Sequence, residues 1–361
     1  MPPLTMSKEE TIFITGFPGF IAARLVKRLA TDGARFLLLV QPAFAARARE
    51  EIKDIARATN NPGEHFRLME GDITRIGLGL SPADSDAARQ ETTTVFHLAA
   101  IYDLAVARDL ATSVNFEGTR NVNSFVRSIG NLRRYHYVST CYVAGLRRGL
   151  IRENELQHDA GFRNNYEETK YLAELEVEAL KAELPVTIHR PAVVCGDSTT
   201  GETAKYDGIY YLIQYLRRWP AALTLVNIGN SDVRLNLVPI DFVIEAMVAL
   251  AKDELAAGTT VQLADPAPLT TRELFDEIAK GLNGRGSFVA VPSEVVRPAL
   301  LFPFAEKISG LPHAAVPYFF LGQTYDTTRA RELLEPHGVR CPRFSDYVQN
   351  LIAFVEEHPR L

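Results

Sequence analysis

The sequence predicts an α/β protein built on a doubly wound parallel sheet, with a smaller mixed region toward the C-terminus. Two observations predict this class. Short apolar runs alternate with longer amphipathic segments through residues 8–200, and the first apolar run ends in a glycine-rich turn. Such alternation favours parallel strand pairing with helices on both faces of the sheet. A chain of 361 residues has room for one large domain and a smaller one.

The strands and helices of the predicted sheet follow one another in a regular order. Residues 11–15 are apolar and end at Gly16, and residues 19–30 then carry apolar side chains at helical spacing. The same alternation continues to residue 189, which favours parallel strands joined by helical crossovers. The expected strands are 11–15, 35–40, 66–68, 93–98, 135–139 and 186–189, and the expected helices are 19–30, 43–58, 114–129 and 166–184.

After about Gly196 the rhythm changes to helical patterns separated by Pro-rich connections. We expect the sheet domain to cover residues 8–200 with parts of 232–265, and residues 201–361 to form mainly a substrate-binding or lid region. Segment 295–320 is rich in proline and aromatic residues. Three interpretations of this segment stay open: ordinary lid packing, a tunnel for an apolar chain, and a surface that contacts a membrane.

Composition and charge exclude several classes of function. Lys plus Arg number 39 against 44 Asp plus Glu, a formal net charge of −5, so no positive field gathers nucleic acid. The three cysteines form no C-x-x-C pair, which argues against a disulfide framework or a metal site and favours the cytoplasm. Proline and glycine interrupt the longest uncharged run, 308–325, so we expect no transmembrane helix. The apolar stretch 11–14 is too short for the core of a signal peptide, so we expect none.

The turn between the first strand and the first helix is the first motif that carries chemistry. Gly16 would allow a tight turn, and Gly19 would let a pyrophosphate approach the backbone where the helix N-terminus supplies N–H groups. A merely structural turn is the alternative. A dinucleotide bound here would contact Thr15, Gly16, Phe17, Pro18, Gly19, Phe20 and Ile21.

The residues after the second and third strands bear on the choice of cofactor. The second strand ends without the acidic residue that favours NAD, at Val40-Gln41-Pro42. Arg47 and Arg49 on the next helix could contact a 2′-phosphate or could simply be solvated cations. We therefore predict NADP, with NAD as the alternative. Asp72 could accept a hydrogen bond from an adenine amine or could cap a helix.

A tyrosine and a lysine predict proton-transfer chemistry. Tyr166 and Lys170 are four residues apart and share one face of a helix. A tyrosine titrates at about pH 10, so a nearby cation is needed to lower its pKa. The preceding strand ends in Ser139 and Thr140, whose hydroxyls could bind the same substrate oxygen.

With these motifs in this order, residues 12–241 resemble the extended short-chain dehydrogenase/reductase superfamily, which has a Rossmann-type fold. The resemblance implies that a hydroxyl of Ser139 or Thr140 binds the carbonyl, with Thr140 favoured by its distance from Gly145. It implies that Tyr166 donates the proton, that Lys170 holds the ribose and lowers the tyrosine pKa, and that Asn115 orders a relay water. The implied cofactor contacts also include Tyr166, Lys170, Arg47, Asp72, Ile73, Leu98, Ala99, Ala100, Pro191, Ala192 and Val193.

Segments 138–145, 190–201 and 236–243 resemble one branch of this superfamily, which holds fatty acyl-CoA reductases and terminal thioester reductase domains. The branch implies NADPH-dependent reduction of an apolar acyl thioester or aldehyde, with the acyl group carried on CoA or on a carrier protein. Gln41 stands where this branch usually has arginine. We expect a free-standing enzyme, and the sequence leaves monomer and homodimer open.

Other activities of the same scaffold remain as alternatives. The same residues could oxidise or reduce a secondary alcohol or ketone, as in a hydroxysteroid-like dehydrogenase. A sugar-nucleotide epimerase or dehydratase is less favoured, because Ala144 replaces the tyrosine of the epimerase pattern. A cofactor-binding regulator without catalysis is disfavoured by the intact Thr140, Tyr166 and Lys170.

Overall fold

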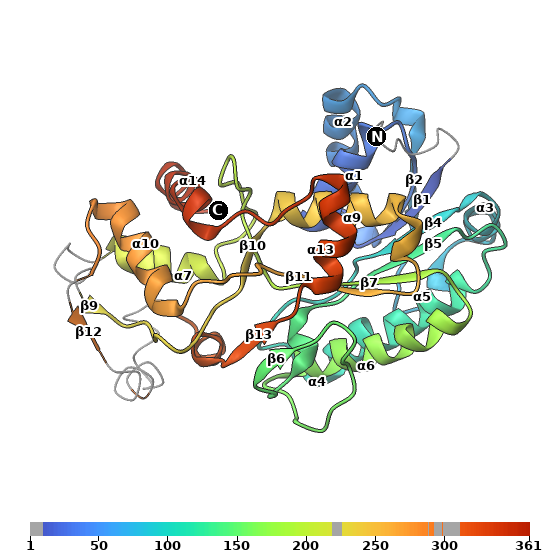
Figure 1. The fold of residues 1–361 in the computed structure, drawn as a ribbon. Coiled ribbons are helices and arrows are strands. Elements are labelled where there is room, and N and C mark those ends of the chain that lie inside the picture. The colour runs from blue at the N-terminus through green and yellow to red at the C-terminus, as the bar shows by residue number, and fades with distance from the viewer. Residues whose placement is uncertain (1–9, 219–225, 288, 292–297, 299–310) are drawn as a thin grey trace.

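The computed structural model describes residues 10–218, 226–287, 289–291, 298 and 311–361. Within these residues, seven parallel strands form one sheet in the order β11-β7-β5-β4-β1-β2-β3, which confirms the predicted fold class (Figure 1). The strands are β1 (Thr11–Thr15), β2 (Arg35–Val40), β3 (Phe66–Glu70), β4 (Thr94–His97), β5 (Arg134–Val138), β7 (Val186–Pro191) and β11 (Thr260–Leu263).

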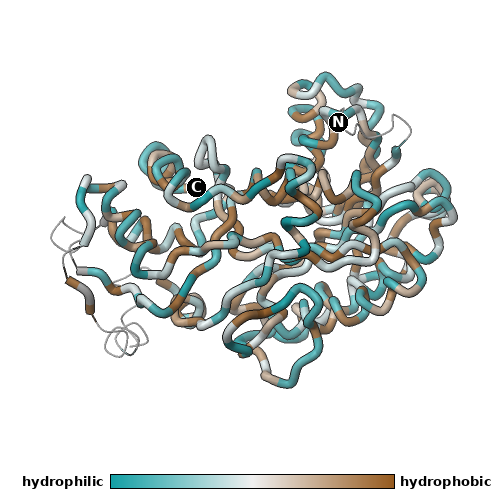
Figure 2. Tube along the Cα trace, in the orientation of Figure 1, coloured by the Kyte–Doolittle hydropathy of each residue, from teal (hydrophilic) through white to brown (hydrophobic). Residues whose placement is uncertain are grey.

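Helices cover both faces of the sheet. One face packs against α1 (Phe20–Ala30), α2 (Ala45–Thr59) and α9 (Ile240–Lys252), and the other packs against α3 (Pro82–Glu91), α5 (Gly118–Val126) and α6 (Asn165–Ala179). Successive side chains of a strand point to opposite faces of the sheet, so both faces are apolar. In β1, Ile12 and Ile14 pack on the face covered by α1, while Phe13 packs on the face covered by α5. Figure 2 shows hydrophobic residues along these central strands.

The strand order reverses at β1, which lies between β2 and β4. Thr15 at the end of β1 is in register with His97 at the end of β4. In open α/β sheets, ligands bind outside the carboxyl ends of the strands at such a reversal. The fold therefore places the glycine-rich turn and the residues after β4 and β5 along one edge of the sheet.

A C-terminal lobe, formed by α7 (Ile209–Arg218), α10 (Thr271–Asn283) and α14 (Phe344–Glu357), has a hydrophobic core of its own. It lies beside the sheet in Figure 1. Two short parallel strand pairs accompany it, β8 (Val193–Cys195) with β10 (Leu237–Pro239) and β9 (Val226–Asn227) with β12 (Val289–Ala290). The expected domain boundaries stay a prediction.

The connection between the sheet and this lobe runs through short elements. The 3₁₀ turn η8 (Val316–Phe320) leads into β13 (Gln323–Tyr325), which pairs with β6 (Gly149–Ile151), and α13 (Thr328–Leu334) follows. Of the segment 295–320 singled out in the sequence, residues 295–297 and 299–310 lie outside the described residues. Over the part of the chain that is described, none of the helices has the length and apolar character needed to cross a membrane.

Candidate active site

The glycine-rich turn after β1 has the geometry that a dinucleotide phosphate needs. Gly16 has a φ of +91°, and a Cβ there would lie 2.8 Å from the Ala99 nitrogen, so only glycine fits. The Gly19 N–H donates to the Gly16 carbonyl at 2.8 Å. No described side chain caps α1, which leaves first-turn N–H groups and the positive end of the helix dipole for an anion. These residues fit the expected cofactor.

A buried chain of hydrogen bonds joins the ends of β1 and β4 to the next helix. Thr15 Oγ1 accepts from the Ala99 N–H at 3.1 Å and lies 2.7 Å from His97 Nδ1. Thr119 Oγ1 donates to the Asn115 carbonyl at 2.7 Å and lies 3.0 Å from His97 Nε2. Because the Thr119 proton is used on that carbonyl, His97 donates from Nε2 and accepts at Nδ1. His97 was not among the predicted site residues, although a histidine closing an apolar strand is a visible signal.

Asn115 lies where the predicted helix 114–129 departs from regular geometry. Residues Thr112–Glu117 form a π-helical segment before α5 begins, a feature often found at functional sites. The Asn115 amide accepts from the Ile101 N–H at 2.8 Å and donates to Thr169 Oγ1 at 3.1 Å. These bonds tie the loop after β4 to α6.

Lys170 is buried on α6 beneath the end of β5. Its Nζ donates to Tyr137 Oη and to the Val138 carbonyl, each at 2.8 Å. Burial lowers the pKa of Lys170 to about 7, and Glu174 partly offsets that effect. Burial and the charge of Lys170 also lower the pKa of His97 to about 3, so the imidazole is neutral.

Tyr166 lies one turn before Lys170 and is also buried, at 6% exposure. Burial raises its pKa, and a hydrogen bond with Thr140 opposes that rise. The charge of Glu167 raises the Tyr166 pKa further, and the lowering of this pKa by Lys170 stays a prediction. The ring of Tyr102 meets that of Tyr166 edge-on, with centroids 5.3 Å apart.

The two neighbouring hydroxyls after β5 have different partners. The Ser139 hydroxyl donates to the buried carboxylate of Glu174, which also pairs with Arg190 at 2.5 Å. Thr140 Oγ1 accepts from the Tyr142 N–H at 3.2 Å, and the Thr140 side chain also acts on the Tyr166 phenol, whose pKa it lowers. The structure thus brings Thr140 together with Tyr166 and commits Ser139 to the Glu174–Arg190 pair.

The residues expected to decide between NADP and NAD lie near the ends of β2 and β3. Arg47 is exposed on α2, while Arg49 pairs with Glu70 at 3.1 Å. Asp72 does not cap a helix, because its Oδ1 accepts from the Thr74 N–H and hydroxyl, both at 2.8 Å. Ile73 follows Asp72, and the remaining expected contacts follow β4 or span the step from β7 to β8: Leu98, Ala99, Ala100, Pro191, Ala192 and Val193.

One group of residues around the start of α6 has no counterpart in the sequence motifs. The Tyr318 hydroxyl donates to Glu167 Oε1 at 2.5 Å and accepts from Asn164 Nδ2 at 2.8 Å. Glu167 is fully buried and pairs with Arg163 at 2.9 Å. Tyr318 and Glu167 are 151 residues apart, so no local pattern announces their contact.

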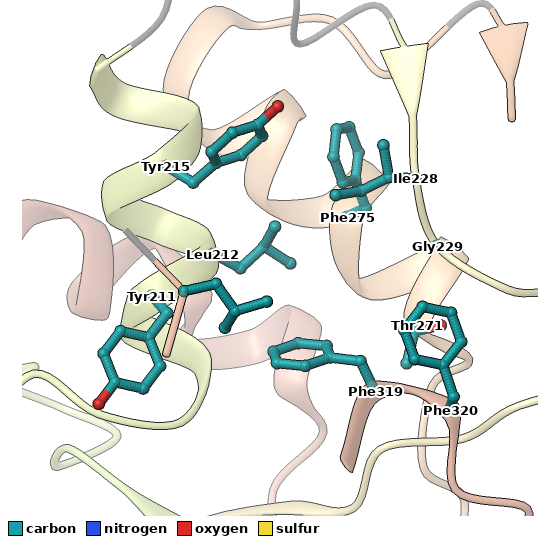
Figure 3. A pocket seen from close by; sticks show the side chains of 10 residues that line it. Tyr211, Leu212, Tyr215, Ile228, Gly229, Thr271, Phe275, Phe319 and Phe320 are labelled. Carbon is teal, nitrogen blue, oxygen red and sulfur yellow. The ribbon is translucent and has the colours of Figure 1, made fainter. Parts of the chain in front are cut away.

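An apolar pocket lies in the C-terminal lobe between α7, α10 and η8. Figure 3 shows the rings of Phe319 and Phe320 reaching into it from η8, opposite Leu212 of α7. These two phenylalanines belong to the aromatic segment noted in the sequence. The pocket is lined by Tyr211, Leu212, Tyr215, Ile228, Gly229, Thr271, Phe275, Leu311, Phe319 and Phe320.

Comparison with known proteins gives matches at the levels of family, sequence and structure. The family model described as male sterility protein matches residues 14–247. A glycine betaine reductase of Emericella nidulans is 26% identical over 76% of this chain and 22% of its own length. A fatty acyl-CoA reductase of Drosophila melanogaster is 24% identical over 68% of this chain and 54% of its own length. The chain therefore spans between a fifth and about half of these two relatives.

A solved structure matches the whole architecture. The terminal R domain of the myxalamid PKS-NRPS biosynthetic pathway superposes with a TM-score of 0.81 and 23% identity. The match covers 98% of this chain and 92% of that one, so it includes the C-terminal lobe as well as the sheet.

Proposed function

The chain belongs to the male sterility protein family. We propose that it is an NAD(P)-dependent oxidoreductase of the extended short-chain type, which reduces an apolar acyl thioester or aldehyde. The observation that carries this proposal is the placement of Thr140 against Tyr166, with Lys170 one turn further along α6 and bonded to the Val138 carbonyl at the end of β5. The glycine-rich turn follows β1 at the same edge of the sheet. The names of the two curated relatives support the reductase activity.

Each residue of this group has a distinct task in the proposed reaction. NADPH, when bound at the turn after Gly16, supplies the hydride that the carbonyl carbon accepts. Thr140 and Tyr166 hydrogen-bond the carbonyl oxygen, and Tyr166 gives this oxygen a proton, which the phenol regains from solvent before the next turnover. With a thioester, breaking the C–S bond then releases aldehyde and thiol, and the hydroxyl proton passes to the sulfur. Lys170 holds the cofactor ribose, and Asn115 keeps the loop at Ile101 in place.

The pocket in the C-terminal lobe supports an apolar substrate class. Its walls are almost wholly apolar, with aromatic rings from α7, α10 and η8. An acyl chain would lose unfavourable contact with water there, whereas a sugar nucleotide would leave its hydroxyls unpaired. CoA or a carrier protein would present the thioester.

We propose NADP as the preferred cofactor. The end of β2 offers Gln41 in place of an acid, and Arg47 on α2 is exposed toward solvent. Arg49 is already paired with Glu70, which leaves Arg47 as the better candidate for a 2′-phosphate. The three free thiols favour a reducing compartment, and we propose the cytoplasm.

The proposal is tested by following oxidation of NADPH and NADH with acyl-CoA thioesters, aldehydes and ketones. We expect oxidation of NADPH with thioesters or aldehydes. In Tyr166→Phe and Thr140→Val, kcat should fall by about 100-fold or more, while NADPH affinity by fluorescence stays within about twofold. Tyr135→Phe is the matched control, because its buried hydroxyl donates to Asn123 away from the site.

Each other outcome points elsewhere. Turnover with ketones alone would support a secondary alcohol dehydrogenase. Tightly held NAD without net oxidation would support an epimerase. Full activity in Tyr166→Phe would exclude Tyr166 as the proton donor.

A further inference from the structure

The 3₁₀ turn η8 faces two parts of the molecule at once. Phe319 and Phe320 line the apolar pocket of the C-terminal lobe (Figure 3). Tyr318, the residue directly before them, is buried against the start of α6. A 3₁₀ turn has about three residues per turn, so successive side chains point in different directions. One short element therefore contacts both the pocket and the helix that carries Tyr166.

Tyr318 contacts residues that lie just before and just after Tyr166 in the sequence. Its hydroxyl donates to Glu167 and accepts from Asn164, the residues on either side of Asn165 and Tyr166. Asn164 is the N-cap of α6, because its Oδ1 accepts from the Glu167 N–H at 3.0 Å. The Tyr318 hydroxyl thus binds the side chains of both residues that this N-cap bond joins.

The same C-terminal segment also contacts the residues that follow Thr140. The ring of Tyr318 meets that of Tyr142 edge-on, with centroids 4.7 Å apart. Gln323 donates from Nε2 to the Gly145 carbonyl at 2.8 Å, which also accepts from Arg163 at 2.7 Å. Both segments that carry the reacting hydroxyls are therefore held by residues 318–323.

We propose that Tyr318 is a positioning residue that links filling of the apolar pocket to the placement of Tyr166. The inference rests on the proposed function. An apolar group in the pocket packs against Phe319 and Phe320 and restrains η8, which holds the Tyr318 hydroxyl on Glu167 and Asn164. A substrate that fills the pocket is then reduced with a higher kcat, and not only with a lower KM, because part of its binding energy orders the proton donor.

The test compares acetyl-CoA with octanoyl-CoA in Tyr318→Phe, which keeps the ring against Tyr142 and removes the hydroxyl. In the unsubstituted enzyme we expect kcat for octanoyl-CoA to exceed that for acetyl-CoA on the order of tenfold. In Tyr318→Phe the ratio should fall close to one, with KM for octanoyl-CoA within about twofold. Tyr135→Phe should keep the original ratio, since its hydroxyl is also buried and bonded but lies in the sheet core.

An unchanged kcat ratio in Tyr318→Phe would overturn the inference, even if that variant were less stable. Should the variant fail to fold, amide hydrogen exchange of the unsubstituted protein decides. Octanoyl-CoA without NADPH should slow exchange in residues 163–170, and acetyl-CoA should not; equal exchange would overturn the proposal. Failure of the proposed function looks different, because then no thioester oxidises NADPH in the unsubstituted enzyme.

Discussion

At the scale of single residues, Lys170 makes the activity dependent on pH. Its pKa is lowered to about 7 in the free protein, so it loses its charge as pH rises through that value. Tyr166, with a raised pKa, stays protonated over the same range. We expect kcat/KM, which reports on the free enzyme, to fall above a pH of about 7 as the charge that holds the cofactor is lost.

The control for this prediction is Lys181→Met. Lys181 also has a pKa lowered by burial, yet it bonds to Thr260 at 2.6 Å, away from the site. The variant should keep the fall, and a flat profile in the unsubstituted enzyme would contradict the role of Lys170. Stability changes in the opposite sense. The unfolded lysine keeps its proton up to about pH 10.5, so the free energy of unfolding should rise with pH between about 7 and 10.5.

The sequence predicted only part of the site at this scale. Tyr166 and Lys170 could be placed on one helix face because a spacing of four is a local property. Ser139 and Thr140 stayed in competition, because what separates them is Glu174, a partner 35 residues from Ser139. Tyr318 could not be predicted at all, since its contact with Glu167 depends on how the C-terminal lobe packs.

At the scale of elements, a buried ion pair fastens α6 to the sheet. Glu174 of α6 is fully buried and pairs with Arg190 of β7, which is 2% exposed, while Ser139 at the end of β5 donates to the same carboxylate. Removing one partner leaves a buried charge unpaired. We expect Glu174→Gln to lower the free energy of unfolding by about 3 kcal/mol, measured in guanidinium chloride.

Glu50→Gln provides the comparison, because Glu50 pairs with Lys53 on the exposed face of α2. Its loss should cost less than about 1 kcal/mol. A double-mutant cycle that combines Glu174→Gln with Arg190→Met should show that their effects on the free energy of unfolding are not additive. Equal decreases in the free energy of unfolding in Glu174→Gln and Glu50→Gln would contradict the expected contribution of the buried pair to stability.

At the scale of the whole molecule, the sheet and the C-terminal lobe have separate cores. Leu351 of α14 is fully buried in the core of the lobe and lies outside the apolar pocket. We expect Leu351→Ala to destabilise the lobe by about 2–5 kcal/mol. In denaturant, circular dichroism should then show an early transition that NADPH binding does not follow. Coincident transitions in the variant would contradict the division into two domains.

The parallel sheet could be predicted because its signal is repeated and local: apolar runs such as 11–15 and 35–40 are followed by helical patterns. The helix α3 after β3 was not predicted. The order of the strands in the sheet could not be predicted, because it depends on the side of the existing strands on which each helical crossover places the next strand. β11, at one edge, is the clearest case, because its pairing with β7 joins residues about seventy positions apart. The π-helical segment at Asn115 was missed for a related reason, as it depends on contacts with Ile101 and Thr169.

The position of β11 also determines the order in which the two cores can form during synthesis on the ribosome. The chain emerges from its N-terminus, so α7, β9 and β10 leave the exit tunnel before β11 is available to cover the edge of β7. The lobe core in turn waits for α14, near residue 344. Neither core can close before synthesis of the other has begun. During translation β7 therefore presents an open strand edge until β11 pairs with it, and unpaired edges of this kind favour aggregation.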